Sequence, residues 1–154
     1  MAWSASKIFV SFIEDALENT AAFALASDSF KVALYDNDIT PDNTVATALT
    51  IYNAGQWTAA GNEVADGTEW DAGGEPLASP TFVPTTNVLK FDGTDTVSGG
   101  TSATLAAVFG CLVYDTTVAS HGVSYNYFGG TNSVYDGTFT VVWAGTGIFT
   151  ITLT

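Results

Sequence analysis

The sequence predicts one mainly β domain of β-sandwich type, with a short amphipathic helix near its start and a second short helix near residues 44–53. A length of 154 residues fits one ordinary domain, and 47% of them are apolar, which is enough for a core. Most apolar runs alternate with Thr, Ser or Gly at a period of two, as in strands with one buried face. No internal repeat or linker divides the chain, so residues 1–154 are expected to form a single domain.

The first helix is predicted from "SKIFVSFIEDALEN", residues 6–19. Its apolar positions follow the spacing i, i+1, i+4, i+5, i+8, i+9, which is one broad helical stripe. Ser4 or Ser6 can cap its start, and Asn19 is a suitable end. The stripe consists of Ile8, Phe9, Phe12, Ile13, Ala16 and Leu17.

The middle of the chain gives mixed signals. Residues 29–36 alternate as a strand, whereas the apolar residues from Val45 to Tyr52 recur at helical spacing and predict the second helix. Residues 55–84 are rich in Gly, Pro, acids and Trp and hold no period. They form either a long surface excursion or two short strands with loops.

The last part of the sequence predicts strands at 87–92, 104–115 and 122–130, and a hairpin of 138–143 with 148–154 across "AGTG". The run 104–115 is apolar on both faces, so it is expected to be central in its sheet.

The strand "IFTITLT", residues 148–154, carries no charged side chain. Phe149, Ile151 and Leu153 share one face, and the threonines share the other. An uncharged strand at a sheet edge recruits other strands. Two arrangements are open. Either the strand is central and paired on both sides, which the long apolar face favours, or it is an edge that a neighbouring subunit completes through residues such as Thr150 and Thr152.

Charge excludes several functions. Sixteen acids against three lysines and no arginine give a formal net charge of −13. Nucleic acids and anionic membranes are bound by clusters of Lys and Arg, so neither is an expected partner. The first residues lack the pattern of a signal peptide, and no apolar run is long enough to span a bilayer, so synthesis in a cytoplasm is expected.

Candidate catalytic residues are few, and no enzyme, cofactor or metal site is predicted. His121, the only histidine, stands between strands near Ser120 and Ser124 and is expected to be an exposed turn residue, not the base of a nucleophile pair. Cys111, the only cysteine, lies in an apolar run and is expected to be buried.

Acidic stretches offer two further hypotheses. Glu69 and Asp71 flank Trp70 and suggest the paired carboxylates of a glycosidase, while the same stretch or "DGTD" at 92–95 suggests a Ca²⁺ site. A Gly-rich acidic stretch is more often a solvated loop, and neither segment matches an EF-hand.

Trp57 and Trp70 present a further choice. Together with the tyrosines they would suit the sugar-stacking platform of a carbohydrate-binding adhesive module, and they suit core or interface anchors equally. Both are therefore candidate interface residues.

The order of segments resembles a family of small virion proteins of tailed phages, especially phages of actinobacteria. The resemblance is carried by "SKIFVSFIEDALEN", "FKVALYDNDITPDN", "NEVADGTEWDAGGEPL", "CLVYDTT", "FGG" and "GTFTVVWAGTGIFTITLT", which together cover nearly the whole chain. The sequence departs from the pattern at Glu69, where the family has Gly before its aromatic residue.

The resemblance implies a capsid decoration (cement) protein on the outer surface of the virion. Its partners would be the major capsid protein and copies of itself, as a trimer or another small ring. It implies no catalytic residue and no cofactor. A tail or tail-fibre-associated structural protein is the alternative within the same class.

Overall fold

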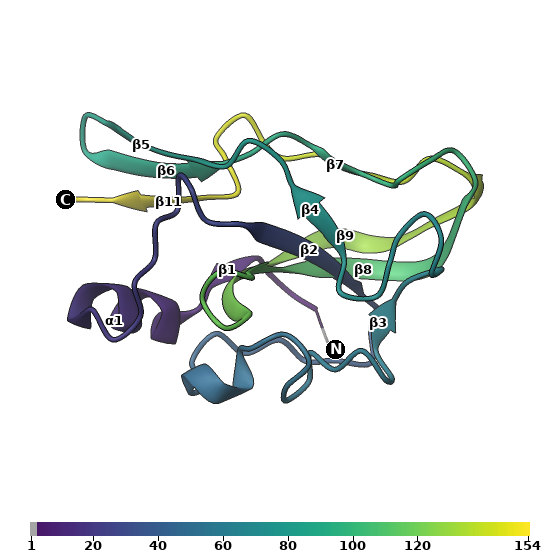
Figure 1. Cartoon of the computed structure of the whole chain (residues 1–154), viewed down its shortest axis with the longest axis horizontal. Helices are drawn as coiled ribbons and strands as arrows, with labels where there is room; N and C mark the ends of the chain where they lie inside the picture. The colour runs from purple at the N-terminus through teal and green to yellow at the C-terminus, as the bar shows by residue number, and fades with distance from the viewer. Residues whose placement is uncertain (1–2) are drawn as a thin grey trace.

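The chain folds as a mainly β protein of packed antiparallel sheets, as predicted. A computed structural model describes residues 3–154. Figure 1 shows two small sheets on one side of a larger sheet, with the helix and a long loop segment on the other side. The helical elements are α1 (Val10–Glu18) and the 3-10 turn η1 (Thr47–Leu49).

The larger sheet has six strands in the order β1-β9-β8-β2-β3, with β4 also paired to β2. The run predicted to be central is central, because β8 lies between β9 and β2. Its side chains are buried on both faces from Gly110 to Asp115. The strands are β1 (Lys7–Ile8), β2 (Phe30–Tyr35), β3 (Glu63–Val64), β4 (Glu75–Leu77), β8 (Ala103–Asp115) and β9 (His121–Gly137).

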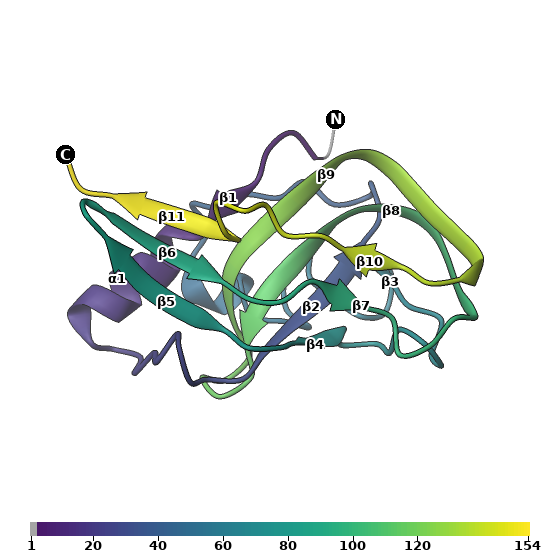
Figure 2. The same ribbon diagram turned by 90° about the horizontal axis from the view of Figure 1, so that it is seen from above.

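The two small sheets form the second layer (Figure 2). One has the order β11-β6-β5 and the other pairs β10 with β7. Phe91 and Phe149 point from the three-stranded sheet into the core, and the Phe91 ring lies 5.1 Å from that of Phe30 on β2. Their strands are β5 (Thr81–Thr85), β6 (Val88–Asp92), β7 (Thr96–Val97), β10 (Thr140–Val141) and β11 (Phe149–Thr152).

The predicted hairpin of 138–143 with 148–154 is wrong. β10 pairs with β7 and β11 pairs with β6, so the two segments belong to different sheets. The turn at Ala144–Gly147 carries the chain from one sheet to the other, and Gly147 has φ +95°. A Cβ there would stand 2.6 Å from the Phe91 carbonyl oxygen, which explains the glycine.

The favoured arrangement of the last strand is also wrong, because β11 is an edge strand that pairs only with β6. Its apolar face is nevertheless used as predicted at Phe149, which is buried. Leu153 is 61% exposed.

The two predicted helices are shorter in the structure. Residues 7–8 form strand β1, and α1 begins after Phe9. Phe9 is the N-cap residue, and its side chain makes no capping hydrogen bond. Ser6 instead accepts the Tyr127 N–H. Asn19 ends the helix in the left-handed region, as predicted. The second helix is reduced to the 3-10 turn η1, where Leu49 N–H donates to the Ala46 carbonyl and Thr50 N–H to the Thr47 carbonyl, three residues back in each case.

Residues 55–84 form short strands with loops and not a surface excursion. Trp57 and Trp70 are fully buried. Asp66 ties the stretch together because its carboxylate accepts the backbone N–H groups of Thr68, Glu69, Trp70 and Thr104. Burial opposes ionisation, but these donors hold the pKa of Asp66 well below its usual range.

Candidate functional site

The free edge of β11 is the first part of the candidate site. Leu153 N–H donates to the Asn87 carbonyl at 2.7 Å, and Ile151 lies opposite Leu89. Peptide groups alternate in direction along an antiparallel strand, so those of Ile151 and Leu153 face β6. The N–H and C=O groups of Thr150 and Thr152 therefore point away from the sheet.

These two residues are also exposed through their side chains. The edge thus offers open backbone groups between small uncharged side chains. Charge, proline or a covering element usually protects such an edge. The predicted contact residues Thr150 and Thr152 therefore lie at an accessible strand edge.

The other edge of the same sheet is protected. On β5, Val83 and Thr85 lie opposite Lys90 and Val88, the β6 residues whose peptide groups point away from β11. Pro84 between them faces outward and has no N–H to offer to a new strand. Pro84 therefore interrupts the outward row of donors on β5, and β11 has no such interruption.

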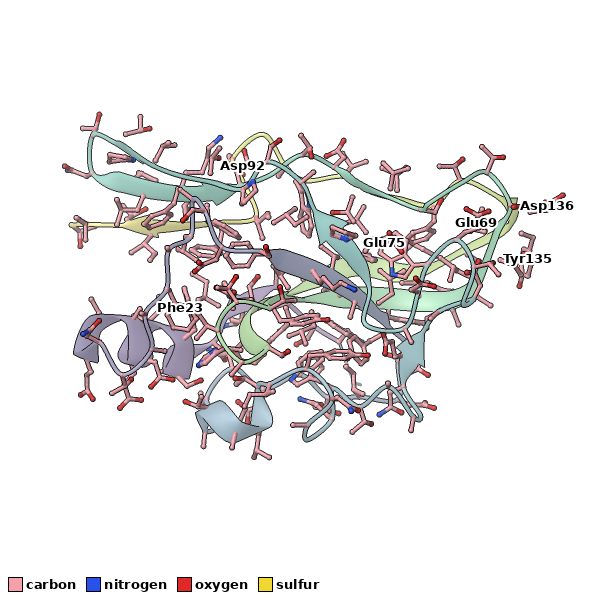
Figure 3. All side chains as sticks on the ribbon, viewed as in Figure 1. Phe23, Glu69, Glu75, Asp92, Tyr135 and Asp136 are labelled. Atoms are coloured by element: carbon pink, nitrogen blue, oxygen red, sulfur yellow. The ribbon has the colours of Figure 1, made fainter. Side chains whose placement is uncertain are left out.

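An apolar groove of about 380 Å³ lies beside the open edge. One wall is α1 and the other is the inner face of the three-stranded sheet, which extends over the helix in Figure 1. Phe23 lies between α1 and this sheet in Figure 3. All ten lining side chains are apolar: Phe12, Ile13, Ala16, Leu17, Phe23, Leu25, Phe82, Leu89, Ile151 and Leu153.

The groove leaves large apolar side chains in water. Leu17 is 82% exposed and Leu153 is 61% exposed. Sequence reasoning placed both in buried faces, because a helical or alternating pattern does not show how far the neighbouring element extends. It missed Phe23, Leu25, Phe82 and Leu89 as parts of one surface, since they come from separate segments and share no motif.

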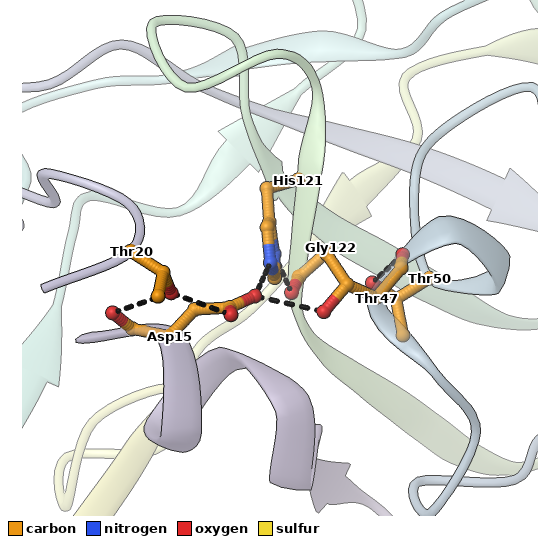
Figure 4. A network of polar contacts seen from close by, with 6 residues as sticks. All are labelled: Asp15, Thr20, Thr47, Thr50, His121 and Gly122. Atoms are coloured by element: carbon orange, nitrogen blue, oxygen red, sulfur yellow. Dashed lines mark hydrogen bonds and ion pairs between the residues drawn. The ribbon is translucent and has the colours of Figure 1, made fainter. Parts of the chain in front are cut away.

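The structure corrects the prediction for His121, which is buried and begins β9. Its Nε2 lies 2.9 Å from Asp15 Oδ2, and its Nδ1 lies 2.9 Å from the Gly122 carbonyl oxygen (Figure 4). Asp15 also accepts the hydroxyls of Thr20 and Thr47. The hydrogen bond from His121, with those from Thr20 and Thr47, lowers the pKa of Asp15.

This cluster joins α1, η1 and β9. Within residues 3–154 no serine hydroxyl hydrogen-bonds to the His121 ring, and Ser124 instead accepts the Asn126 amide. The described contacts of His121 and Asp15 link three separate segments of the fold.

The acidic stretch that suggested a glycosidase or Ca²⁺ site is occupied by local hydrogen bonds. Glu69 accepts the Ser102 hydroxyl, and Glu63 accepts the Gly73 N–H and the Tyr52 hydroxyl. Burial raises the pKa of Glu63, and these two donors oppose that rise. Over the described part of the chain, no three His, Cys, Asp or Glu side chains are grouped to hold a metal ion.

The prediction that Trp57 and Trp70 lie at an interface is wrong, because neither ring has an exposed face. Trp57 packs edge-on against Trp3 and Phe9, and Trp70 packs edge-on against Phe139. Their large apolar area is used in the core. The sugar-stacking platform therefore loses its two tryptophans. Cys111 is buried in β8, as predicted.

Comparison of the chain with known protein families, curated proteins and solved structures finds no match. In the part of the chain that the structure describes, no helix is long and apolar enough to cross a membrane.

Proposed function

We propose that the chain is a structural protein that decorates the outside of a phage capsid and stabilises the shell. The observation that carries the proposal is the open, uncharged edge of β11 beside an exposed apolar groove. Such a surface is suited to contact with protein, because an added strand forms backbone hydrogen bonds with β11 and buries the apolar groove at the same time. The resemblance of the segment order to small virion proteins supports the same role.

The net charge favours the outer face of the shell over the inner one. A chain with a net charge of −13 would be repelled by packaged nucleic acid. A tightly packed β fold also suits a protein whose task is to persist on a particle. The shell gains from many repeated contacts, even where each contact is weak.

The test is a mass-spectrometric count of the chain in purified particles of the phage that encodes it, with imaging to place it. A fixed ratio to the major capsid protein is expected. A few copies at the tail would favour the tail-associated alternative, and absence from the particle would overturn both.

Particles that lack the chain provide the matched control. They are expected to lose their DNA at a lower temperature than complete particles, because the contacts across the shell are missing. Adding the purified protein back should restore the original temperature. Equal release temperatures with and without the chain would remove the stabilising role.

A further inference from the structure

We propose that the open edge of β11 is a self-association site, at which two copies of this chain pair their β11 strands antiparallel about a two-fold axis near Thr152. The occupant of the edge is then a second copy. This inference concerns the same edge that supports the proposed function, but it is tested independently of that function.

The backbone geometry allows this pairing. The outward peptide groups on each copy are those of Thr150 and Thr152, and a two-fold axis brings even-numbered residues opposite even-numbered residues. Donors then meet acceptors along the new ladder. Paired residues share a face, so Ile151 and Leu153 of both copies lie on the same side of one continuous six-stranded sheet.

The apolar side of this sheet explains why a second copy is favoured. The groove side chains Leu17 and Leu153 are the two most exposed leucines in the described residues. The two-fold axis places these two surfaces side by side, so each covers apolar area of the other. Single exposed leucines are ordinary, but a contiguous patch at an open strand edge indicates an interface.

Charge points the same way. Two chains of net charge −13 repel one another unless they meet where neither carries acids. No groove-lining residue is charged and β11 carries no charged side chain, so the acids nearest to this contact are Glu14 and Glu18 on the outer part of α1. Figure 3 shows Glu69 and Asp136 at the end of the molecule opposite to Phe23 and the groove. A basic partner would find no carboxylate to bind among the groove side chains.

Pro84 on β5 favours a two-fold arrangement. A ring of three or more copies joined through this sheet would pair β11 of one copy with a different edge of the next. The far edge of the sheet carries Pro84, which offers no N–H. Pairing that uses the β11 edge twice avoids Pro84, and it closes as a dimer. This differs from the trimer or other small ring that the family resemblance implies.

The test is the oligomeric state of the purified full chain, measured by sedimentation velocity over a range of concentrations. The wild type is expected to show a monomer–dimer equilibrium. Thr152→Pro removes the outward N–H and keeps the Leu153 bond to β6, so it should be monomeric. Thr152→Val keeps that N–H and should dimerise like the wild type.

A second pair of variants tests the groove. Leu17→Lys should shift the equilibrium toward monomer, because it places a charge in the shared apolar surface. Leu49→Lys changes an exposed leucine that does not line the groove and should leave the dimer intact. Circular dichroism and thermal unfolding must show that all four variants are folded.

Hydrogen exchange gives a readout that does not depend on variants. The Thr150 and Thr152 amides should become protected as concentration rises, while the Ile151 amide is protected throughout. The inference is overturned by a wild type that is monomeric or trimeric, by a dimer that survives both Thr152→Pro and Leu17→Lys, or by unprotected Thr150 and Thr152 amides in the dimer.

The two proposals fail separately. A monomer in solution that is stoichiometric on particles would mean that a shell protein occupies the edge, so the inference fails and the proposed function stands. If the chain forms a Thr152-dependent dimer but is absent from particles, the inference stands and the proposed function fails.

Discussion

At the scale of single residues, buried carboxylates set how stability responds to pH. Asp115 lies at the end of β8 and is fully buried. Its Oδ1 accepts the N–H groups of Thr117 and Val118, while Oδ2 has no hydrogen-bond partner within residues 3–154. Burial raises the pKa of Asp115 to about 6, the two N–H donors lower it, and the Asp28 carboxylate raises it further.

The sign of the pH effect follows from this shift. The folded pKa lies above the unfolded value of about 4, so the folded state binds the proton more tightly. The resulting stabilisation is complete below about pH 4 and is lost as the pH rises through about 6. Asp115→Asn removes the titration. The free energy of unfolding of the variant, relative to that of the wild type, should therefore rise by about 1 kcal/mol from about pH 5 to about pH 8.

Urea unfolding of both proteins at the two pH values measures this difference. Asp38→Asn is the control, since Asp38 is exposed and its side chain makes no hydrogen bond among the described residues. Parallel pH profiles for Asp115→Asn and the wild type would contradict the role given to Asp115.

At the scale of elements, β11 has a core side and a contact side. Substitutions on the two sides should therefore differ in their effect on the free energy of unfolding. Phe149 is buried with its ring 5.2 Å from Phe91 and 6.2 Å from Phe12, whereas Thr150 is exposed. We expect Phe149→Ala to lower the free energy of unfolding by about 3 kcal/mol, because it leaves a cavity between the sheet and α1. Thr150→Ala should change it by less than about 0.5 kcal/mol.

Urea unfolding at low protein concentration checks both values on the monomer. If Phe149→Ala were as mild as Thr150→Ala, β11 would not be held by the core. The strand would then be too loosely attached to present a fixed edge to another copy.

Sequence patterns predicted elements well where local period and burial agree. The strands near 29–36, 87–92 and 104–115 lie where they were expected, and Asn19 ends the helix. The alternation in 138–154 identified the inward position of Phe149 but not its partner strand. Alternation records which face is buried and carries no information on pairing.

Of the candidate site, the sequence predicted the strand edge but not the groove. Thr150 and Thr152 were expected to be contact residues from the uncharged edge alone. The groove was not predictable, because its walls meet only through the tertiary fold. His121 was misjudged for a related reason, since Asp15, which holds its ring, lies 106 residues away along the chain.

At the scale of the whole molecule, the groove side chains are uncharged, although α1, which forms one wall of the groove, also carries Glu14, Asp15 and Glu18. The acids Glu69 and Asp136 lie at one end in Figure 3, and the uncharged groove lies at the other. Two copies that meet at their grooves keep these acids apart. The remaining repulsion between chains of net charge −13 is long-ranged and therefore sensitive to salt.

Association should consequently strengthen as salt is added. Raising ionic strength from about 0.01 M to about 0.15 M shortens the Debye length from about 30 Å to about 8 Å. The like-charge repulsion falls, while the strand pairing and apolar contact remain. Sedimentation equilibrium in NaCl should show a dissociation constant that decreases over this range, with Thr152→Pro monomeric throughout. A contact held by ion pairs weakens with salt, so a dissociation constant that increases would show that charged residues hold the copies together and that the groove does not.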